Sequence, residues 1–191
     1  MDMSFALTYE NKILKRIIST VSIVMFFFIS TGCDSNQNDA KSVKEFPLNS
    51  KLDSRISESI IAWNQDKLKH TEKQFETHLV YGTEKNGEKM YVYLHSLMQG
   101  YNRETKTVPQ AGHLLPVRVT VTKNGDDYII EDYREPGDGA ENEPTLRKMF
   151  PTKYADQALA ISNETIQSLE SRMQESVSKW LEETNNERHE R

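Results

Sequence analysis

Residues 78–95 read HLVYGTEKNGEKMYVYLH, which places Asn86-Gly87 between two segments that alternate apolar and polar side chains. This pattern is the strongest short-range signal for a β-hairpin with a two-residue type I′ turn. With Asn86-Gly87 as the turn, the register opposes Leu79 to Leu94 and gives both strands one apolar face. The other predicted apolar pairs are Tyr81 with Val92 and Phe75 with Met98.

A second hairpin is predicted in residues 117–130, which read VRVTVTKNGDDYII around Asn124-Gly125. The predicted pairs are Val121 with Tyr128, Val119 with Ile130 and, on the polar face, Arg118 with Glu131. The segment from Gly100 to Leu114 connects the hairpins, either as a long hairpin connection or as a functional loop. The two hairpins together predict an antiparallel sheet of about four strands.

Helices are predicted before and after this sheet. Residues 53–69 have apolar residues at helical spacing, and Asp53 or Ser54 can cap the first turn. A longer helix begins after a cap at Ser162 or Asn163. The expected buried stripes are Ile56, Ile60 and Trp63 in the first helix and Ile166, Leu169, Met173, Val177 and Trp180 in the second.

Helices segregated from strands indicate an α+β fold, in which the long C-terminal helix packs on the apolar face of the sheet. Two short helices are expected between them, over residues 144–150 and 154–159. A cystatin-like or nuclear-transport-factor-like architecture is a candidate, on the basis of fold analogy alone.

The N-terminal part of the chain has the features of a secretory signal. Lys12, Lys15 and Arg16 precede an apolar run from Ile17 to Ile29, and small residues at 30–32 follow it. The run is shorter than the about 20 apolar residues that span a bilayer, whereas a signal peptide has this length and order.

The order Ser30-Thr31-Gly32-Cys33 resembles the lipobox of bacterial lipoprotein precursors, although that family usually has Leu where Ser30 stands. The resemblance implies cleavage after Gly32, a diacylglycerol on Cys33, and attachment to the extracytoplasmic face of the cell membrane. One acyl chain alone binds a bilayer only marginally, and two or three hold stably. A signal peptide with an incidental cysteine and an uncleaved anchor are the alternatives.

The expected organisation has four parts. They are a signal peptide over 1–32, a lipidated Cys33 with a flexible tether over 33–50, a single α+β domain over 51–183 and a charged tail over 184–191. Cys33 is the only cysteine, so no disulfide can stabilise the domain. The net charge of −5 argues against a nucleic-acid partner, which selects basic surfaces.

The predicted register places His78 opposite His95, and two imidazoles on adjacent strands could share zinc or copper. A tight zinc site needs three or four ligands, so His113 or Glu76 would have to contribute. The alternative is two solvent-exposed or hydrogen-bonded histidines on the less apolar face of the sheet. No nucleophile, phosphate-binding or metalloprotease motif is present, and we expect neither an enzyme nor a bound cofactor.

Four segments also resemble small extracytoplasmic domains of Firmicutes, which occur as lipoproteins or joined to membrane sensors of the β-lactam-sensing type. They are Tyr91–Leu94, Leu115–Val119, Glu131–Gly139 and Met149–Pro151. The hypothesis for the whole chain is a membrane-anchored interaction or sensing module that binds an unknown envelope protein or ligand. The alternative is a small-ligand, metal-binding or enzymatic domain. A cavity lined by Tyr91, Tyr93, His78 and His95 would favour the alternative, and a filled core would favour the module.

Overall fold

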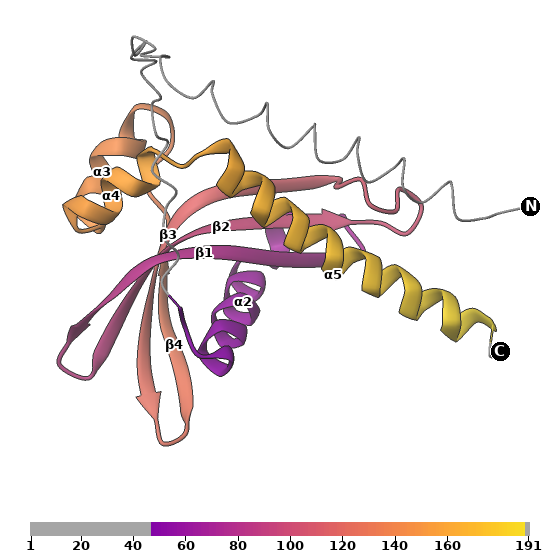
Figure 1. Ribbon diagram of the computed structural model, residues 1–191, viewed down its shortest axis with the longest axis horizontal. Helices are drawn as coiled ribbons and strands as arrows, with labels where there is room; N and C mark the ends of the chain where they lie inside the picture. Colours follow the sequence, from indigo (N-terminus) through magenta and orange to yellow (C-terminus); the bar gives the residue numbers. More distant parts are fainter. Residues whose placement is uncertain (1–46, 190–191) are drawn as a thin grey trace, which may run out of the picture. The chain divides into compact units, whose positions relative to one another are not determined.

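The computed structural model describes residues 47–189, which form an α+β fold with a four-stranded antiparallel sheet in the order β1-β2-β3-β4 (Figure 1). The fold class predicted from the sequence is confirmed. The elements are α2 (Ser50–Asn64), η1 (Gln65–Leu68), β1 (Lys73–Asn86), β2 (Lys89–Tyr101), β3 (Ala111–Asn124), β4 (Asp127–Arg134), η2 (Gly139–Glu141), α3 (Asn142–Met149), α4 (Thr152–Leu159) and α5 (Asn163–His189).

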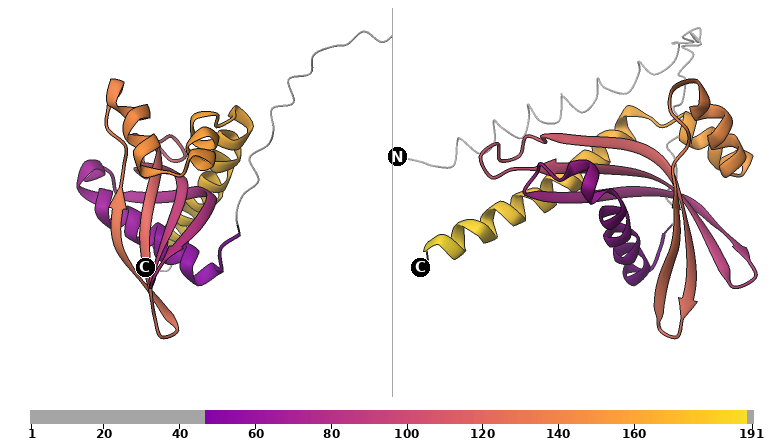
Figure 2. Two further views of the ribbon diagram at one scale, coloured as in Figure 1. Left: turned by 90° about the vertical axis from the view of Figure 1, so that its left-hand side faces the viewer. Right: turned by 180° about the vertical axis from the view of Figure 1, so that it is seen from behind.

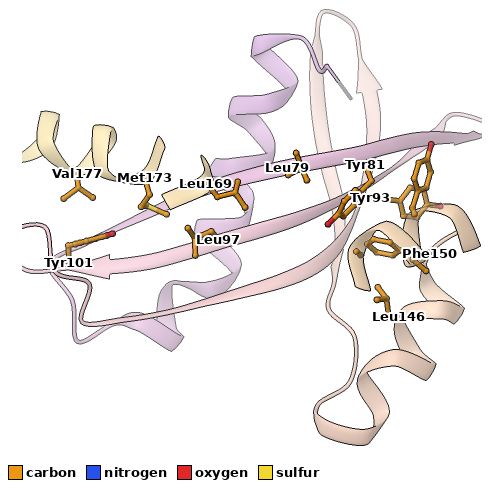
Figure 3. Close-up of a cluster of buried hydrophobic side chains, with 13 residues drawn as sticks. Leu79, Tyr81, Tyr93, Leu97, Tyr101, Leu146, Phe150, Leu169, Met173 and Val177 are labelled. Carbon is orange, nitrogen blue, oxygen red and sulfur yellow. The ribbon is translucent and has the colours of Figure 1, made fainter. Parts of the chain in front are cut away.

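Helices cover both faces of the sheet, α2 on one and α3, α4 and α5 on the other (Figure 2). On the α2 face, Leu52, Ile56 and Ile60 pack against valines and leucines of the three longer strands. Figure 3 shows the core on the opposite face. Its buried members include Leu79, Leu97 and Tyr101 from the sheet, Leu146, Phe150 and Tyr154 from α3 to α4, and Leu169, Met173 and Val177 from α5.

The predicted packing of α5 on the sheet is correct. Leu169, Met173 and Val177 are fully buried, and Trp180 lies edge-on to Phe75 with 5.9 Å between ring centroids. The hydroxyl of Ser162 accepts a hydrogen bond from an amide of the first turn, as expected for a cap. The helix continues to His189, so most of the expected charged tail is helical.

The first helix differs from the prediction at both ends. It begins at Ser50, and the side chain of Asn49 caps it by accepting a hydrogen bond from the Leu52 amide. It ends at Asn64. Trp63 is 43% exposed and stacks on Tyr133 of β4 instead of joining the core.

The predicted register of the first hairpin is wrong. Asn86 pairs with Lys89, so the turn consists of Gly87-Glu88 and not Asn86-Gly87. Gly87 has a φ of +62°, whereas Asn86 is not among the residues with positive φ. Glycine at the first central position is typical of a type II′ turn, while type I′ needs positive φ at both positions.

A bulge at Tyr81 shifts the pairing once more. Beyond it, Leu79 pairs with His95 and Val80 pairs with Leu94. The shift leaves Leu79 in the core under α5 and Leu94 in the core under α2. Gly82, next to the bulge, has no room for a side chain, because any Cβ would overlap the ring and hydroxyl of Tyr154.

The second hairpin deviates in the same way. Its turn is Gly125-Asp126, and a bulge between Ile130 and Asp132 follows. Arg118 therefore faces Arg134 and lies 3.7 Å from Asp132, whereas the sequence predicted Glu131 beside it. The other predicted pairs of both hairpins are displaced accordingly.

The connection between the hairpins is shorter than expected, because β2 extends to Tyr101 and β3 begins at Ala111. Within the described residues, no helix has both the length and the apolar character needed to cross a membrane. The expected signal segment, Cys33 and nearly all of the tether lie outside the described residues.

Candidate functional site

The structure separates the two histidines that the sequence placed opposite each other. His78 pairs with Ser96, and its ring contacts the α2 side of the sheet. His95 pairs with Leu79 and bonds to Tyr81 in the core on the other face. The two imidazoles therefore share neither a metal site nor a cavity.

The two residues considered as a third ligand are also apart. His113 lies in β3 and pairs with Met98, which in turn pairs with Glu76 of β1. The side chain of Met98 on β2 therefore lies between Glu76 and His113. Within the described part of the chain, no group of three or more His, Cys, Asp or Glu side chains is arranged to hold a metal ion.

His78 belongs instead to a buried cluster of charged and hydroxyl groups. Its Nδ1 lies 3.0 Å from Glu76 Oε2, and its Nε2 lies 3.2 Å from Asp53 Oδ1. The Glu76 side chain is 0% exposed and accepts hydrogen bonds from Ser57 at 2.7 Å and Ser96 at 2.6 Å. The cluster thereby joins α2 to β1 and β2.

This cluster holds His78 in its charged form. Burial by itself lowers the pKa of His78, but the charge of Glu76 and hydrogen bonds to Asp53 and Glu76 outweigh it and raise the pKa to about 10. Both ring nitrogens then donate to carboxylates, and Ser57 donates to Glu76. The arrangement is an ion-pair network in which a charged imidazolium cannot accept a proton from Ser57.

His95 is held in the opposite state. Burial lowers its pKa to about 4 and raises the pKa of the Tyr81 hydroxyl, which lies 2.6 Å from His95 Nδ1. The tyrosine therefore donates to a neutral imidazole. Tyr93 is also buried, stacked on Tyr154 and edge-on to Phe150.

A polar cavity of about 270 Å³ lies at the edge of β1, beside the His78 cluster. Asp53 and Ser57 line it from α2, and Arg172 and Glu175 line it from α5. Arg172 donates a hydrogen bond to the carbonyl oxygen of His78 at 2.7 Å. The cavity is thus bordered by groups that already bond to one another.

A larger groove, of about 720 Å³, lies on the α2 face beside the tips of both hairpins. Figure 1 shows how the two hairpins extend beyond the helices. The groove has an apolar floor that includes Met90 and Val121, which pair across β2 and β3. We call it the hairpin groove. Its lining residues are Pro47, Leu48, Asn49, Leu52, Thr83, Lys85, Gly87, Glu88, Lys89, Met90, Val121, Lys123 and Tyr128.

The first turn of α2 is attached to the second hairpin and closes one end of the hairpin groove. Asn49 Nδ2 donates to the Tyr128 hydroxyl at 2.9 Å. Lys51 donates to the Asp126 carbonyl oxygen at 2.5 Å, and Arg55 forms an ion pair with Asp127 at 2.8 Å. These contacts hold the start of α2 against the second hairpin and leave the hairpin groove open.

The hairpin groove carries positive charge that its surroundings do not neutralise. Lys85 and Lys123 are exposed on different strands, and neither has an ion pair or side-chain hydrogen bond with a described residue. Lys89, at the tip, is bonded to Glu131 at 2.8 Å. Glu88 is the one carboxylate among the lining residues.

Sequence reasoning did not find the hairpin groove, because the predicted register opposed Lys85 to Glu88. The observed register pairs Lys85 with Met90 and so places the lysine beside the apolar floor. The sequence does show a lysine near each turn. Without the correct register, however, the face of the sheet on which each lysine lies could not be assigned.

Comparison of the chain with known proteins found no relative. No family model matches the chain, and neither the curated proteins nor the solved structures contain a match.

Proposed function

We propose that this chain is a lipid-anchored module that binds another protein at the extracytoplasmic face of the cell membrane. The hairpin groove is the observation that carries the binding part of the proposal. A groove that combines apolar side chains with two lysines lacking an ion pair among the described residues is a surface that favours binding of a partner. The anchoring part is supported by the signal pattern that ends at Cys33.

The filled interior supports a binding module over an enzyme. Tyr93 and His95, which would have lined a pocket between sheet and helix, are buried among other side chains. The titratable cluster around His78 is an ion-pair network, and it presents no activated nucleophile. Both features stabilise the scaffold on which the groove is built.

Small-ligand binding is the second candidate, and the polar cavity beside His78 is the observation in its favour. The cavity is small for a ligand pocket, since pockets commonly measure about 300–1,000 Å³. Its charged groups would also have to exchange existing hydrogen bonds for ligand contacts. We therefore rank it below protein binding.

Two measurements test the two parts separately. The intact mass of the membrane-extracted protein should correspond to a chain beginning at Cys33 with attached acyl chains, and Cys33→Ser should leave unprocessed precursor or released domain. A mature chain that begins elsewhere or lacks lipid would end the anchoring claim.

The binding part is tested by photo-crosslinking in the native envelope. A benzophenone side chain at Thr83, inside the hairpin groove, should crosslink to a discrete envelope protein. The same side chain at Ser168, on the exposed face of α5, is the control. Equal crosslinking from both positions would contradict the proposal.

A further inference from the structure

The hairpin groove combines two chemical surfaces that together select an occupant. Met90 and Val121 pair across β2 and β3, and because Val121 is only 1% exposed, the half-buried Met90 and Leu48 provide the apolar surface that is open to a partner. Methionine adapts its shape to different apolar side chains. The floor is therefore suited to a leucine-, isoleucine- or phenylalanine-sized anchor.

Positive charge borders this surface at two points. Lys85 pairs with Met90 from β1, and Lys123 follows Val121 by two residues on β3, on the same face and nearer the hairpin tip. Because neither ammonium group has a carboxylate partner among the described residues, each is available to an incoming one. Charge of this sign attracts acidic segments even though the chain as a whole is negative.

The arrangement fits an extended chain. The side chains of a strand point alternately to its two faces, so every second residue faces the same surface. An apolar residue seated on the floor can then be flanked by carboxylates that reach the two lysines. Resting on the proposed function, we infer that the occupant is an extended acidic peptide segment of an envelope protein, anchored by an apolar side chain.

The tips of the hairpins argue against a lipid surface as the occupant. They consist of Asn86-Gly87-Glu88 and Asn124-Gly125-Asp126, which offer no apolar side chain to a bilayer and carry two carboxylates. An acidic peptide meets the lysines on the concave face without contacting these tips.

Selection from a random twelve-residue peptide library tests the inference without assuming a sequence. The full chain is captured in detergent through a C-terminal tag, which leaves the groove free. Three forms are compared: the unmodified chain, K85E/K123E, and K69E/K179E. The last pair has the same change in charge at exposed lysines outside the groove.

The unmodified chain and K69E/K179E should enrich the same net-acidic peptides that contain Leu, Ile or Phe. Their affinity for K85E/K123E should be about tenfold weaker, since two exposed ion pairs are lost. It should also fall with added salt, because exposed charges are screened. K85E/K123E should instead enrich basic peptides.

Enrichment of neutral or basic peptides by the unmodified chain overturns the inference, as does enrichment that is insensitive to K85E/K123E. Self-association, or binding to anionic phosphatidylglycerol vesicles, that is lost in K85E/K123E but kept in K69E/K179E would assign the groove to a second copy or to lipid. None of these results bears on the anchoring test, which is the intact mass of a chain that begins at a lipidated Cys33. The crosslinking from Thr83 still decides whether a protein partner exists.

Discussion

At the scale of single residues, the buried charges show how the sheet and its helices are joined. Glu76 is completely buried, and it is tolerated there because His78, Ser57 and Ser96 all bond to its carboxylate. Removing one partner of such a buried pair leaves the other charge uncompensated. We therefore expect the cluster to control stability and its pH dependence.

The free energy of unfolding should fall as the pH rises from about 6.5 to about 10, because the folded pKa of His78 is raised to about 10. A histidine whose pKa is higher in the folded than in the unfolded state stabilises the fold fully when the pH is below the unfolded-state pKa. This stabilisation is lost as the pH rises through the folded-state pKa. Denaturant titrations across this range should show a decline on the order of a few kcal/mol. His78→Gln should be less stable at pH 6.5 and should lack the decline.

His95→Gln is the control for this pH profile. The lowered pKa of His95, about 4, contributes stability above the unfolded value of about 6.5 and loses it as the pH falls. Its replacement should therefore change the acid side of the profile and leave the alkaline decline in place. An alkaline decline that survives in His78→Gln would contradict the assignment.

Gly82 is the residue that allows Tyr154 to pack on the sheet. Gly82→Ala should lower the free energy of unfolding by about 1–3 kcal/mol, because the added methyl group overlaps the tyrosine ring. In the Tyr154→Ala background the same substitution should cost much less. Additive effects in this double-mutant cycle, measured by denaturant unfolding, would show that the contact is not the cause.

At the scale of elements, the helices were predictable and the strand register was not. The stripe of Leu169, Met173 and Val177 recurs at helical spacing, so burial of one residue implies burial of the others. The register depends on where each turn begins, and two positions of the Asn-Gly pairs are compatible with a tight turn. The bulge at Tyr81 adds a further shift, and Gly82 beside it packs against Tyr154, which is distant in sequence.

The error in the strand register also explains why the candidate site was predicted incorrectly. His78 and His95 were singled out by a register that is off by one residue, and such a slip moves side chains to the opposite face. The ion-pair network of His78 involves α2, which sequence periodicity located but could not orient toward Glu76. The hairpin groove depends on the corrected pairing of Lys85 with Met90.

The helix α5 should behave as part of the core. Met173→Ala should lower the free energy of unfolding by about 2–5 kcal/mol, the usual cost of truncating a buried methionine. Ser168→Ala, on the exposed face of the same helix, should change it by less than about 0.5 kcal/mol. Equal and small effects from both substitutions, measured by chemical denaturation, would show that α5 is displayed for a partner.

At the scale of the whole molecule, the two closed cores and the open groove have complementary roles. Helices bury both faces of the sheet along most of its length, and the two hairpins extend from this rigid part toward the start of α2 (Figure 2). The segment that enters α2, from Pro47 to Asn49, also lines the hairpin groove.

Quantitative isolation of the chain from its own envelope tests the central claim most directly. The unmodified chain, Met90→Asp in the hairpin groove and Ser168→Asp on α5 should be extracted with equal yields, and the proteins that accompany them compared by mass spectrometry. We expect at least one envelope protein that accompanies the unmodified chain and Ser168→Asp and is about tenfold depleted with Met90→Asp. Recovery of the same proteins in equal amounts with all three would contradict a partner in the hairpin groove.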